Sequence, residues 1–159
     1  MQKHTIIITI PNQITILTRI IGLLCSKGCN VKNIIGAPTE NPDIYKLHLE
    51  IHGSKPRVEL IIKQLNNLAD TLKVVDISHN TNYISRELLL VKVNDINKSS
   101  EIFQLINTFK AKLVDITRTD ITIDLTGSSS KIDRFIDLLK PYGIKEFVRS
   151  GKLALKGNQ

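Results

Sequence analysis

Hydrophobic and polar residues alternate along the chain with two different periods, and the order of these periods predicts the elements of the fold. Residues 4–10 are almost continuously apolar and β-branched, which is typical of a strand buried on both faces. From 15 to 27, apolar residues recur every three or four positions, which predicts an amphipathic helix that ends at Gly28. A second apolar run at 31–37 predicts the next strand.

The following residues extend this pattern to a complete unit. A turn rich in Asn, Asp and Pro at 40–43 precedes residues 45–52, where apolar and polar side chains alternate with a period of two. That period predicts a strand with one buried face. A helix is expected from Lys55, with Pro56 near its first position, and a fourth strand is expected at 72–78. Residues 1–80 therefore read β-α-β-β-α-β.

The second half of the chain repeats this order. The expected elements are a strand at 88–93, a helix at 99–109, strands at 111–116 and 121–126, a helix at 128–140, a strand at 143–148 and a short addition at 153–155. We predict an α+β fold of two tandem ferredoxin-like βαββαβ units, 1–80 and 81–159, each an antiparallel sheet with helices on one face. Units of about eighty residues bury a modest core, so pairing with another copy is expected.

The charge balance narrows the classes of partner. The formal net charge is +7, and the excess is divided evenly between the two halves of the chain. A nucleic-acid surface would show a clustered basic stripe with interleaved aromatic residues, and aromatics are only 4% here. No apolar run approaches the ~20 residues of a membrane span, and no targeting segment is recognisable. We expect no nucleic-acid and no membrane partner, and a basic surface that suits an acidic partner.

The cysteines and histidines do not form a recognisable metal motif. Cys25 and Cys29 are four positions apart on a helical pattern, a poor spacing for a disulfide, and we expect reduced and largely buried thiols. His48 and His52 share the polar face of one predicted strand, with Glu50 between them. A metal site is conceivable there, but a solvated sheet face is favoured.

No pattern of catalytic residues stands out either. The chain has neither a Gly-x-Gly-x-x-Gly nor a Walker-type loop. Residues 126–130 (TGSSS) resemble a phosphate loop, but a strand-to-helix turn with a Ser N-cap is the better interpretation. Asp120 and Asp124 lie at the start and on the outward face of one strand, with no base nearby in sequence. We therefore predict no catalytic residues.

The turn at 11–15 (PNQIT) is the strongest candidate for binding. It places backbone amides and the side chain of Asn12 at a helix N-terminus, a position that suits an amino-acid carboxylate. The alternative is an Asx-turn in which Asn12 only caps the helix, and the residues alone leave both interpretations open. Asn30 and Asn33, near the start of the next strand, can approach this end of a neighbouring copy if two sheets pair edge to edge.

These residues resemble a known family. The first domain of acetolactate synthase small (regulatory) subunits has the pattern N-x-x-G-x-L-x-R-V, a helix, R-G-y-N-I and a strand ending A-P-T. The chain resembles it at Asn12, Leu17, Arg19, Ile20, Gly22, Leu23, Gly28, Asn30, Ala37, Pro38 and Thr39. The second-domain opening of the family resembles RELLLVKV at 86–93, and its C-terminal half resembles residues 113–118, 127–139 and VRSG at 148–151.

The resemblance implies a non-catalytic protein. Residues 1–80 would form an ACT domain for effector binding and dimerisation, and 81–159 an ACT-like domain for activation. The chain would bind the catalytic subunit of acetolactate synthase, raise its activity and confer feedback inhibition by valine in branched-chain (isoleucine and valine) amino-acid biosynthesis. No cofactor is expected on this chain; thiamine diphosphate, Mg and FAD are expected on the catalytic subunit. The implied location is the cytoplasm, or the plastid stroma for an organelle-encoded protein.

The resemblance also implies an effector site at the interface of a homodimer. Valine or a related small amino acid would contact Asn12, Gln13, Ile14, Thr15, Ile16 and Leu17 of one copy, and Asn30 and Val31 of the facing copy. The chain departs from the motif because its glycine is Thr15 here. Glycine permits a close backbone approach, so a narrower pocket and a weaker valine response are expected.

Two other classes of function are compatible with a small α+β chain of this kind. A free-standing amino-acid-sensing ACT protein could regulate another enzyme or transcription, and it would not associate with a thiamine-diphosphate-dependent synthase. A small enzyme on a ferredoxin-like scaffold is disfavoured, because no nucleophile, base or metal ligand set can be identified.

Overall fold

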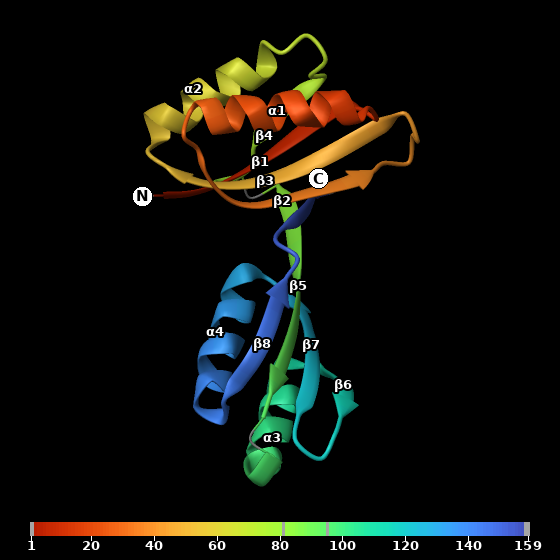
Figure 1. The fold of residues 1–159 in the computed structure, drawn as a ribbon, viewed down its shortest axis with the longest axis vertical. Coiled ribbons are helices and arrows are strands. Elements are labelled where there is room, and N and C mark those ends of the chain that lie inside the picture. Colours follow the sequence, from red (N-terminus) through yellow and green to blue (C-terminus); the bar gives the residue numbers. More distant parts are fainter. Residues whose placement is uncertain (1, 81, 95, 158–159) are drawn as a thin grey trace. The chain divides into compact units, whose positions relative to one another are not determined.

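The computed structural model describes residues 2–80, 82–94 and 96–157, which form two α+β units (Figure 1). The first unit contains the chain up to Ile84 together with the C-terminal segment from Lys152, and the second contains Ser85–Gly151. The sequence placed the division between 80 and 81 and assigned all later residues to the second unit. The return of the C-terminal segment to the first unit is a feature that the hydrophobic pattern does not contain.

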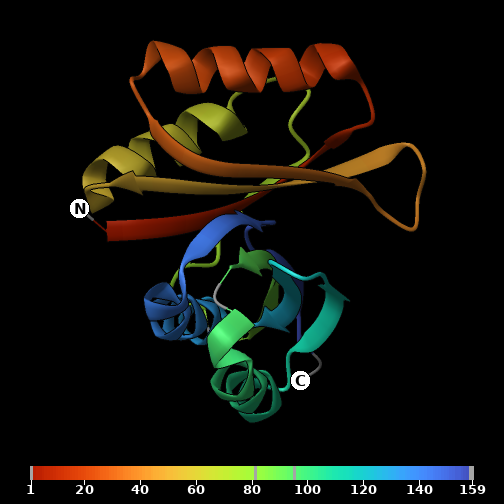
Figure 2. The ribbon, with the colours of Figure 1, turned by 60° about the horizontal axis from the view of Figure 1, so that its bottom comes forward.

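The first unit has the predicted β-α-β-β-α-β order. Its elements are β1 (Gln2–Pro11), α1 (Ile14–Ser26), β2 (Asn30–Pro38), β3 (Ile44–Gly53), α2 (Lys55–Asn66) and β4 (Lys73–Asp76). The strand order is β2-β3-β1-β4, and all neighbouring strands are antiparallel. Both helices lie on the same face of this sheet (Figure 2). Ile6 and Ile8 of the central strand β1 are buried beneath the helices, whereas Ile7 points to the opposite face and is buried against Ile77 and Ala154.

The core of the first unit forms between the inward face of the sheet and the apolar faces of the helices. Alternate residues of β1 and β3 point toward the helices, and α1 covers them with Ile16, Ile20 and Leu24, which are spaced four apart. Each such side chain stabilises the fold by about 1.5–3 kcal/mol when fully buried. Gly28 follows α1 with a φ of 56° and, as predicted, ends the helix. Arg57 Nη2 of α2 donates hydrogen bonds to the carbonyls of Lys27 and Gly28, which secures the same end.

The second unit repeats the topology of the first. Its elements are β5 (Tyr83–Val93), the 3-10 turn Ile96–Lys98, α3 (Ser99–Phe109), β6 (Lys112–Ile116), β7 (Ile121–Gly127), α4 (Ser129–Leu139), the 3-10 turn Lys140–Tyr142 and β8 (Ile144–Arg149). The strand order β6-β7-β5-β8 is the order of the first unit carried forward by one repeat. The predicted duplication is therefore confirmed. Phe135 fills the centre of this core, where it packs against Phe109.

One carboxylate of the second unit is buried and paired. Glu87 is 2% exposed on the inward face of β5, and its Oε2 accepts a hydrogen bond of 2.6 Å from Arg149 Nη2. Ser129 Oγ at the start of α4 donates to the other carboxylate oxygen, and Arg149 also binds Asp133 at 2.6 Å. Burial lowers the pKa of Arg149, but these hydrogen bonds outweigh it and raise that pKa overall. The network joins β5, β8 and α4.

The C-terminal strand β9 (Leu153–Lys156) covers part of the open face of the first sheet. Ala154 is 4% exposed because it packs against Ile7 and Ile77. His48 Nε2–H donates to the carbonyl of Ala154 at 3.1 Å, so this histidine is 6% exposed. The solvated sheet face that the sequence favoured for His48 is therefore wrong. The alternating pattern correctly placed His48 opposite the helices, but a strand more than a hundred residues later buries it.

The covering role of β9 predicts a specific loss of stability. In Ala154→Glu, a carboxylate would be forced against Ile7 and Ile77, so we expect β9 to detach and the free energy of unfolding to fall by about 2–3 kcal/mol. Leu155 is 69% exposed, and Leu155→Glu on the same strand should change stability by less than about 0.5 kcal/mol. Urea unfolding and amide hydrogen exchange of residues 152–157 measure both effects. Equal stability of the two variants would show that β9 does not hold the sheet face.

Candidate effector site

The N-terminus of α1 offers unpaired backbone donors. Gln13 is the N-cap residue with an extended backbone, and its side chain makes no capping hydrogen bond. The first turn of the helix contains no acidic residue, so no side chain of that turn offsets the positive end of the helix dipole. Ile14 and Thr15 carry the first two helical amides, and both residues are exposed. This end of α1 can accept a small anion.

Asn12 fixes the β2–β3 turn beside this helix end. Its backbone N–H donates to the carbonyl of Asp43 at 2.8 Å, and its side-chain Nδ2–H donates to the carbonyl of Pro42 at 3.0 Å. The Asx-turn in which Asn12 caps the helix is therefore wrong. Asn41 forms the Asx-turn instead, accepting the amide of Asp43 at 3.0 Å. The start of α1 and the turn after the Ala37–Thr39 motif are thereby held next to each other.

The other predicted site residues of this segment, 14–17, differ in how far their side chains are exposed. Ile14 is 76% exposed, and the side chain of Thr15 is also at the surface. Ile16 is only 2% exposed and belongs to the core, so it can offer a ligand nothing but its backbone. Leu17 is half-buried against the same core. Thr15, which stands at the position of the glycine in the family motif, thus faces the surface at the start of α1.

Asn30 and Val31 lie at the opposite end of the sheet from Asn12 in the same copy. Asn30 is opposite His52, which is opposite Lys3 at the start of β1, whereas Asn12 follows the last residue of β1. The eight steps from Lys3 to Pro11 span about 26 Å at roughly 3.3 Å per residue. One copy therefore does not bring the two asparagines together. Val31 is half-buried, and its amide already donates to Cys29 at 3.1 Å.

A second polar cluster, which sequence reasoning missed, closes the other edge of the first sheet. His4 is 2% exposed, and its Nδ1 lies 3.2 Å from Asp76 Oδ2. Ser78 Oγ donates to the same carboxylate and accepts the amide of Thr5 at 2.9 Å. Burial raises the pKa of Asp76, but the hydrogen bonds from Ser78 and His4 outweigh it and lower that pKa.. Because the serine proton is directed to Asp76, this cluster ties β1 to β4 and is not a nucleophile–base pair.

The remaining candidates for chemistry do not assemble into a site. Cys25 is exposed, contrary to the prediction, while Cys29 is half-buried, and burial raises the pKa of its thiol. Asp120 is bound by Thr119 and by Lys145 Nζ at 3.2 Å, and these contacts lower its pKa. Ser128 accepts the amide of Lys131, which confirms the predicted N-cap. Within residues 2–80, 82–94 and 96–157, no group of three or more potential ligands could hold a metal.

The same described ranges contain no helix that is long and apolar enough to cross a bilayer.

Comparisons with known proteins agree over both units. Residues 6–73 match the family described as the AHAS small subunit-like ACT domain, and residues 86–158 match the small subunit of acetolactate synthase. The first match lies within the first unit, and the second covers the second unit from Arg86 and continues into the C-terminal segment that returns to the first unit.

Several relatives match along nearly their whole length. The probable acetolactate synthase small subunit of Archaeoglobus fulgidus is 38% identical over 159 residues, covering 99% of each chain. The small subunit of Bacillus subtilis is 39% identical over 160 residues, covering 99% of this chain and 92% of the relative. The crystal structure of the Thermotoga maritima small subunit matches with a TM-score of 0.87 and 29% sequence identity. The match covers 100% of this chain and 99% of that one. The two tandem ferredoxin-like ACT units and these matches show that the chain belongs to the acetolactate synthase small-subunit family.

Proposed function

We propose that this chain is a non-catalytic regulatory subunit that activates the catalytic subunit of acetolactate synthase and makes it sensitive to valine. Membership of the small-subunit family supports the partnership with a catalytic subunit. The single observation that carries the regulatory role is the uncapped N-terminus of α1 beside the turn fixed by Asn12. The sequence itself contains no motif for a cofactor, so turnover is assigned to the partner.

The geometry suits an amino acid as effector. Its carboxylate would lie against the amides of Ile14 and Thr15, where the helix dipole contributes about 0.3–1 kcal/mol. That contribution alone is weak, so further polar contacts must supply most of the affinity and the specificity. The carbonyls and side chains of the β2–β3 turn lie on one side of the helix end. The ammonium group requires such oxygen acceptors.

A second copy can complete the site through β2. This strand is at the edge of the sheet, and its free edge can pair with another chain. Antiparallel pairing about a two-fold axis near Ile34 would bring Asn30 of the second copy opposite Pro38. Pro38 is opposite Tyr45, next to the Ile44–Pro11 pair that precedes Asn12. A dimer paired in this way places Asn30 of the second copy at the same end of the sheet as Asn12, which supports an effector site shared between two chains.

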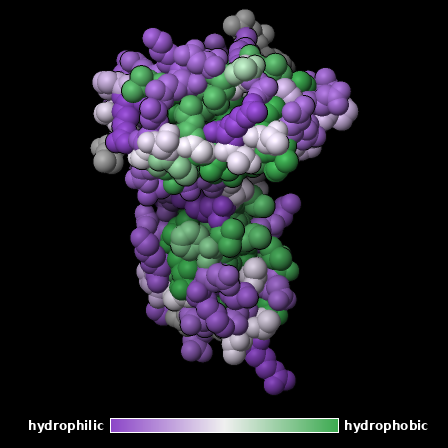
Figure 3. All heavy atoms as spheres, turned by 45° about the horizontal axis from the view of Figure 1, so that its top comes forward, coloured by the Kyte–Doolittle hydropathy of each residue, from purple (hydrophilic) through white to green (hydrophobic). Residues whose placement is uncertain are grey.

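The open face of the second sheet supplies a surface for the catalytic subunit. Leu90 and Val148 are directly opposite each other on β5 and β8 and are 43% and 60% exposed, and Leu88 is 41% exposed nearby. Apolar side chains gather on the surface of this unit (Figure 3). Exposed apolar clusters mark interaction sites, so we assign the contact with the catalytic subunit to Leu88, Leu90 and Val148.

Reconstitution tests the assignment of activity. The purified chain should form no acetolactate, and it should raise the rate of the catalytic subunit in proportion to the complex formed. Leu90→Asp should weaken this activation at least about tenfold, because it places a charge in the contact. Leu138→Asp, at a residue 41% exposed on α4, should leave activation unchanged. Turnover by the chain alone would favour the small enzyme. The absence of binding in a pull-down with the synthase would favour the free-standing sensor.

The effector site predicts separable effects on valine inhibition. Asn12→Ala should raise the valine concentration for half-inhibition by about 10–100-fold, because losing a hydrogen bond to a charged group costs roughly 1.5–3 kcal/mol. Activation should persist. Thr15→Gly should lower that concentration by removing the exposed side chain at the helix end. Thr18→Ala, one turn further along the same exposed face, is the matched control. Identical valine curves for all four proteins would show that this turn has only a structural role.

Edge pairing of β2 predicts that a negative charge introduced in the middle of this strand weakens the dimer. Ile34 is 38% exposed at the middle of the strand, so Ile34→Asp would set two carboxylates against each other across the two-fold axis. We expect the dimer dissociation constant to rise by about a hundredfold or more, since opposed like charges cost several kcal/mol. Leu60→Asp, at a residue 52% exposed on α2, should have no such effect. Sedimentation equilibrium of the full chain decides, and an unaffected dimer would place the interface elsewhere.

A further inference from the structure

A cleft in the second unit is lined by cations that the proposed function does not use. It lies where the end of α3 meets the start of α4 and has a volume of about 680 Å³. That volume is in the range of small-molecule sites, roughly 300–1,000 Å³. Its lining consists of Thr108, Phe109, Lys110, Ser130, Lys131 and Arg134, so it carries three positive charges and no carboxylate.

One of these cations occupies an unfavourable position on its helix. Lys131 lies in the first turn of α4, where the helix dipole repels positive charge and no acidic residue is present, and Arg134 follows it one turn later. The neighbouring acids of α4 are already engaged, Asp133 by Arg149 and Asp137 by Lys140. The ion pairs found among the described residues include neither Lys131 nor Arg134. An anion between them would relieve this repulsion.

The third cation is held by a strained backbone. Lys110 has a φ of 53°, and it is the only residue other than glycine with a positive φ in the described part of the chain. Glycine or asparagine would adopt this left-handed conformation at lower cost at the end of a helix. Such outliers cluster at functional sites. Two separate departures from local stability, at the end of α3 and at the start of α4, therefore bring cations to the same cleft.

The remaining lining residues give the cleft polar and apolar sides. Ser130 Oγ lies 3.1 Å from Ser128 Oγ, and Ser128 is the residue that caps α4. Phe109 is half-buried because its ring packs against Phe135 with centroids 5.0 Å apart, so the apolar side of the cleft is continuous with the core. Guanidinium and ammonium groups with an adjacent hydroxyl are the donors that bind phosphate oxygens.

We propose that this cleft binds a small molecule that carries phosphate groups, with the anion between Lys110, Lys131 and Arg134 and an apolar portion against Phe109. The site is built only from residues of the second unit, so it is distinct from the effector site of the first. It makes the second unit a ligand-binding module in its own right. Its occupancy would be governed by metabolite concentration independently of valine.

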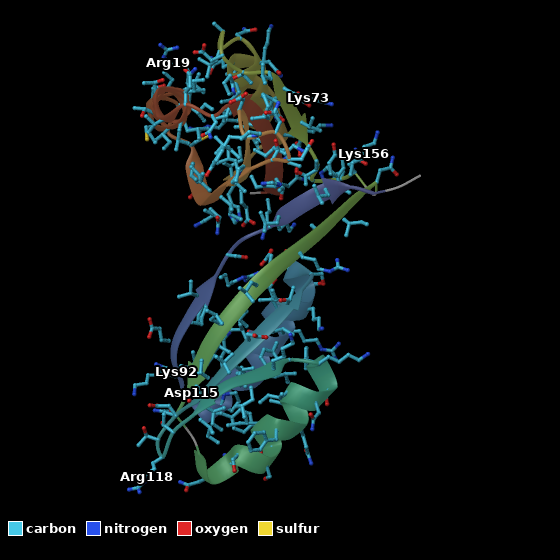
Figure 4. All side chains as sticks on the ribbon, turned by 90° about the vertical axis from the view of Figure 1, so that its right-hand side faces the viewer. Arg19, Lys73, Lys92, Asp115, Arg118 and Lys156 are labelled. Carbon is cyan, nitrogen blue, oxygen red and sulfur yellow. The ribbon has the colours of Figure 1, made fainter. Side chains whose placement is uncertain are left out.

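Calorimetric titration of the full chain with inorganic pyrophosphate at about 0.15 M ionic strength tests this proposal. Arg134→Gln and Lys131→Gln should each weaken binding by about 10–100-fold, because each removes a charge-assisted hydrogen bond. Arg118→Gln is the control, since Arg118 is exposed in the β6–β7 loop away from the two helices (Figure 4). Lys110→Gly is the sharpest variant. It should raise the unfolding temperature by relieving the positive φ and at the same time weaken pyrophosphate binding.

Three results would overturn the proposal. Absence of saturable pyrophosphate binding up to millimolar concentration would remove the ligand class. Equal weakening in Arg118→Gln would show that the net charge of +7, and not the cleft, attracts the anion. Loss of catalytic-subunit activation in the cleft variants without any pyrophosphate binding would identify a protein contact instead.

Discussion

Each unit of this protein buries only one face of a four-membered antiparallel sheet, and the rest of the molecule follows from that constraint. The helices cover the inward face, where alternate residues of the central strands form a core of isoleucine, leucine and valine. A sheet covered in this way keeps an open face, whose side chains contact solvent or another part of the protein. It also keeps two edges, whose unpaired backbone N–H and C=O groups need hydrogen-bond partners. In the first unit β9 occupies part of the open face, whereas the edge strand β2 is free for another chain.

The functional candidates lie at element ends for the same reason. A helix exposes its unpaired amides only in its first turn, and the chain leaves that turn uncapped at Ile14 while it caps α4 with Ser128. The two helices are not counterparts in the repeat, since α4 occupies the position of α2. In the first unit the uncapped helix end is that of α1, and in the second unit cations line the cleft at the start of α4.

Two polar networks tie the sheets together where the apolar core ends. His4, Asp76 and Ser78 join β1 to β4, and Glu87, Arg149 and Ser129 join β5 to β8 and α4. Both are almost fully satisfied by hydrogen bonds, as buried polar groups must be to remain stable. They show why a buried acid or histidine is not by itself a sign of catalysis, since here each connects strands that are distant in sequence.

The sequence alone determined the elements, their order and the duplication, because periods of 2 and 3.6 are local properties of the chain. Both ends of helix α3 were predicted correctly, and Gly28 and Pro56 marked helix boundaries through their own backbone preferences. The sequence also indicated Asn12 and its turn as a candidate binding site, and the motif resemblance indicated the family. Only the tertiary structure decided which polar residues are buried, as His48 shows, because burial depends on contacts with Ala154 more than a hundred residues away. It likewise decided that Asn12 holds the β2–β3 turn, that Asn12 and Asn30 lie at opposite ends of one sheet, and that Lys110 and Arg134 share a cleft. These are long-range juxtapositions set by strand order, and no local pattern encodes strand order.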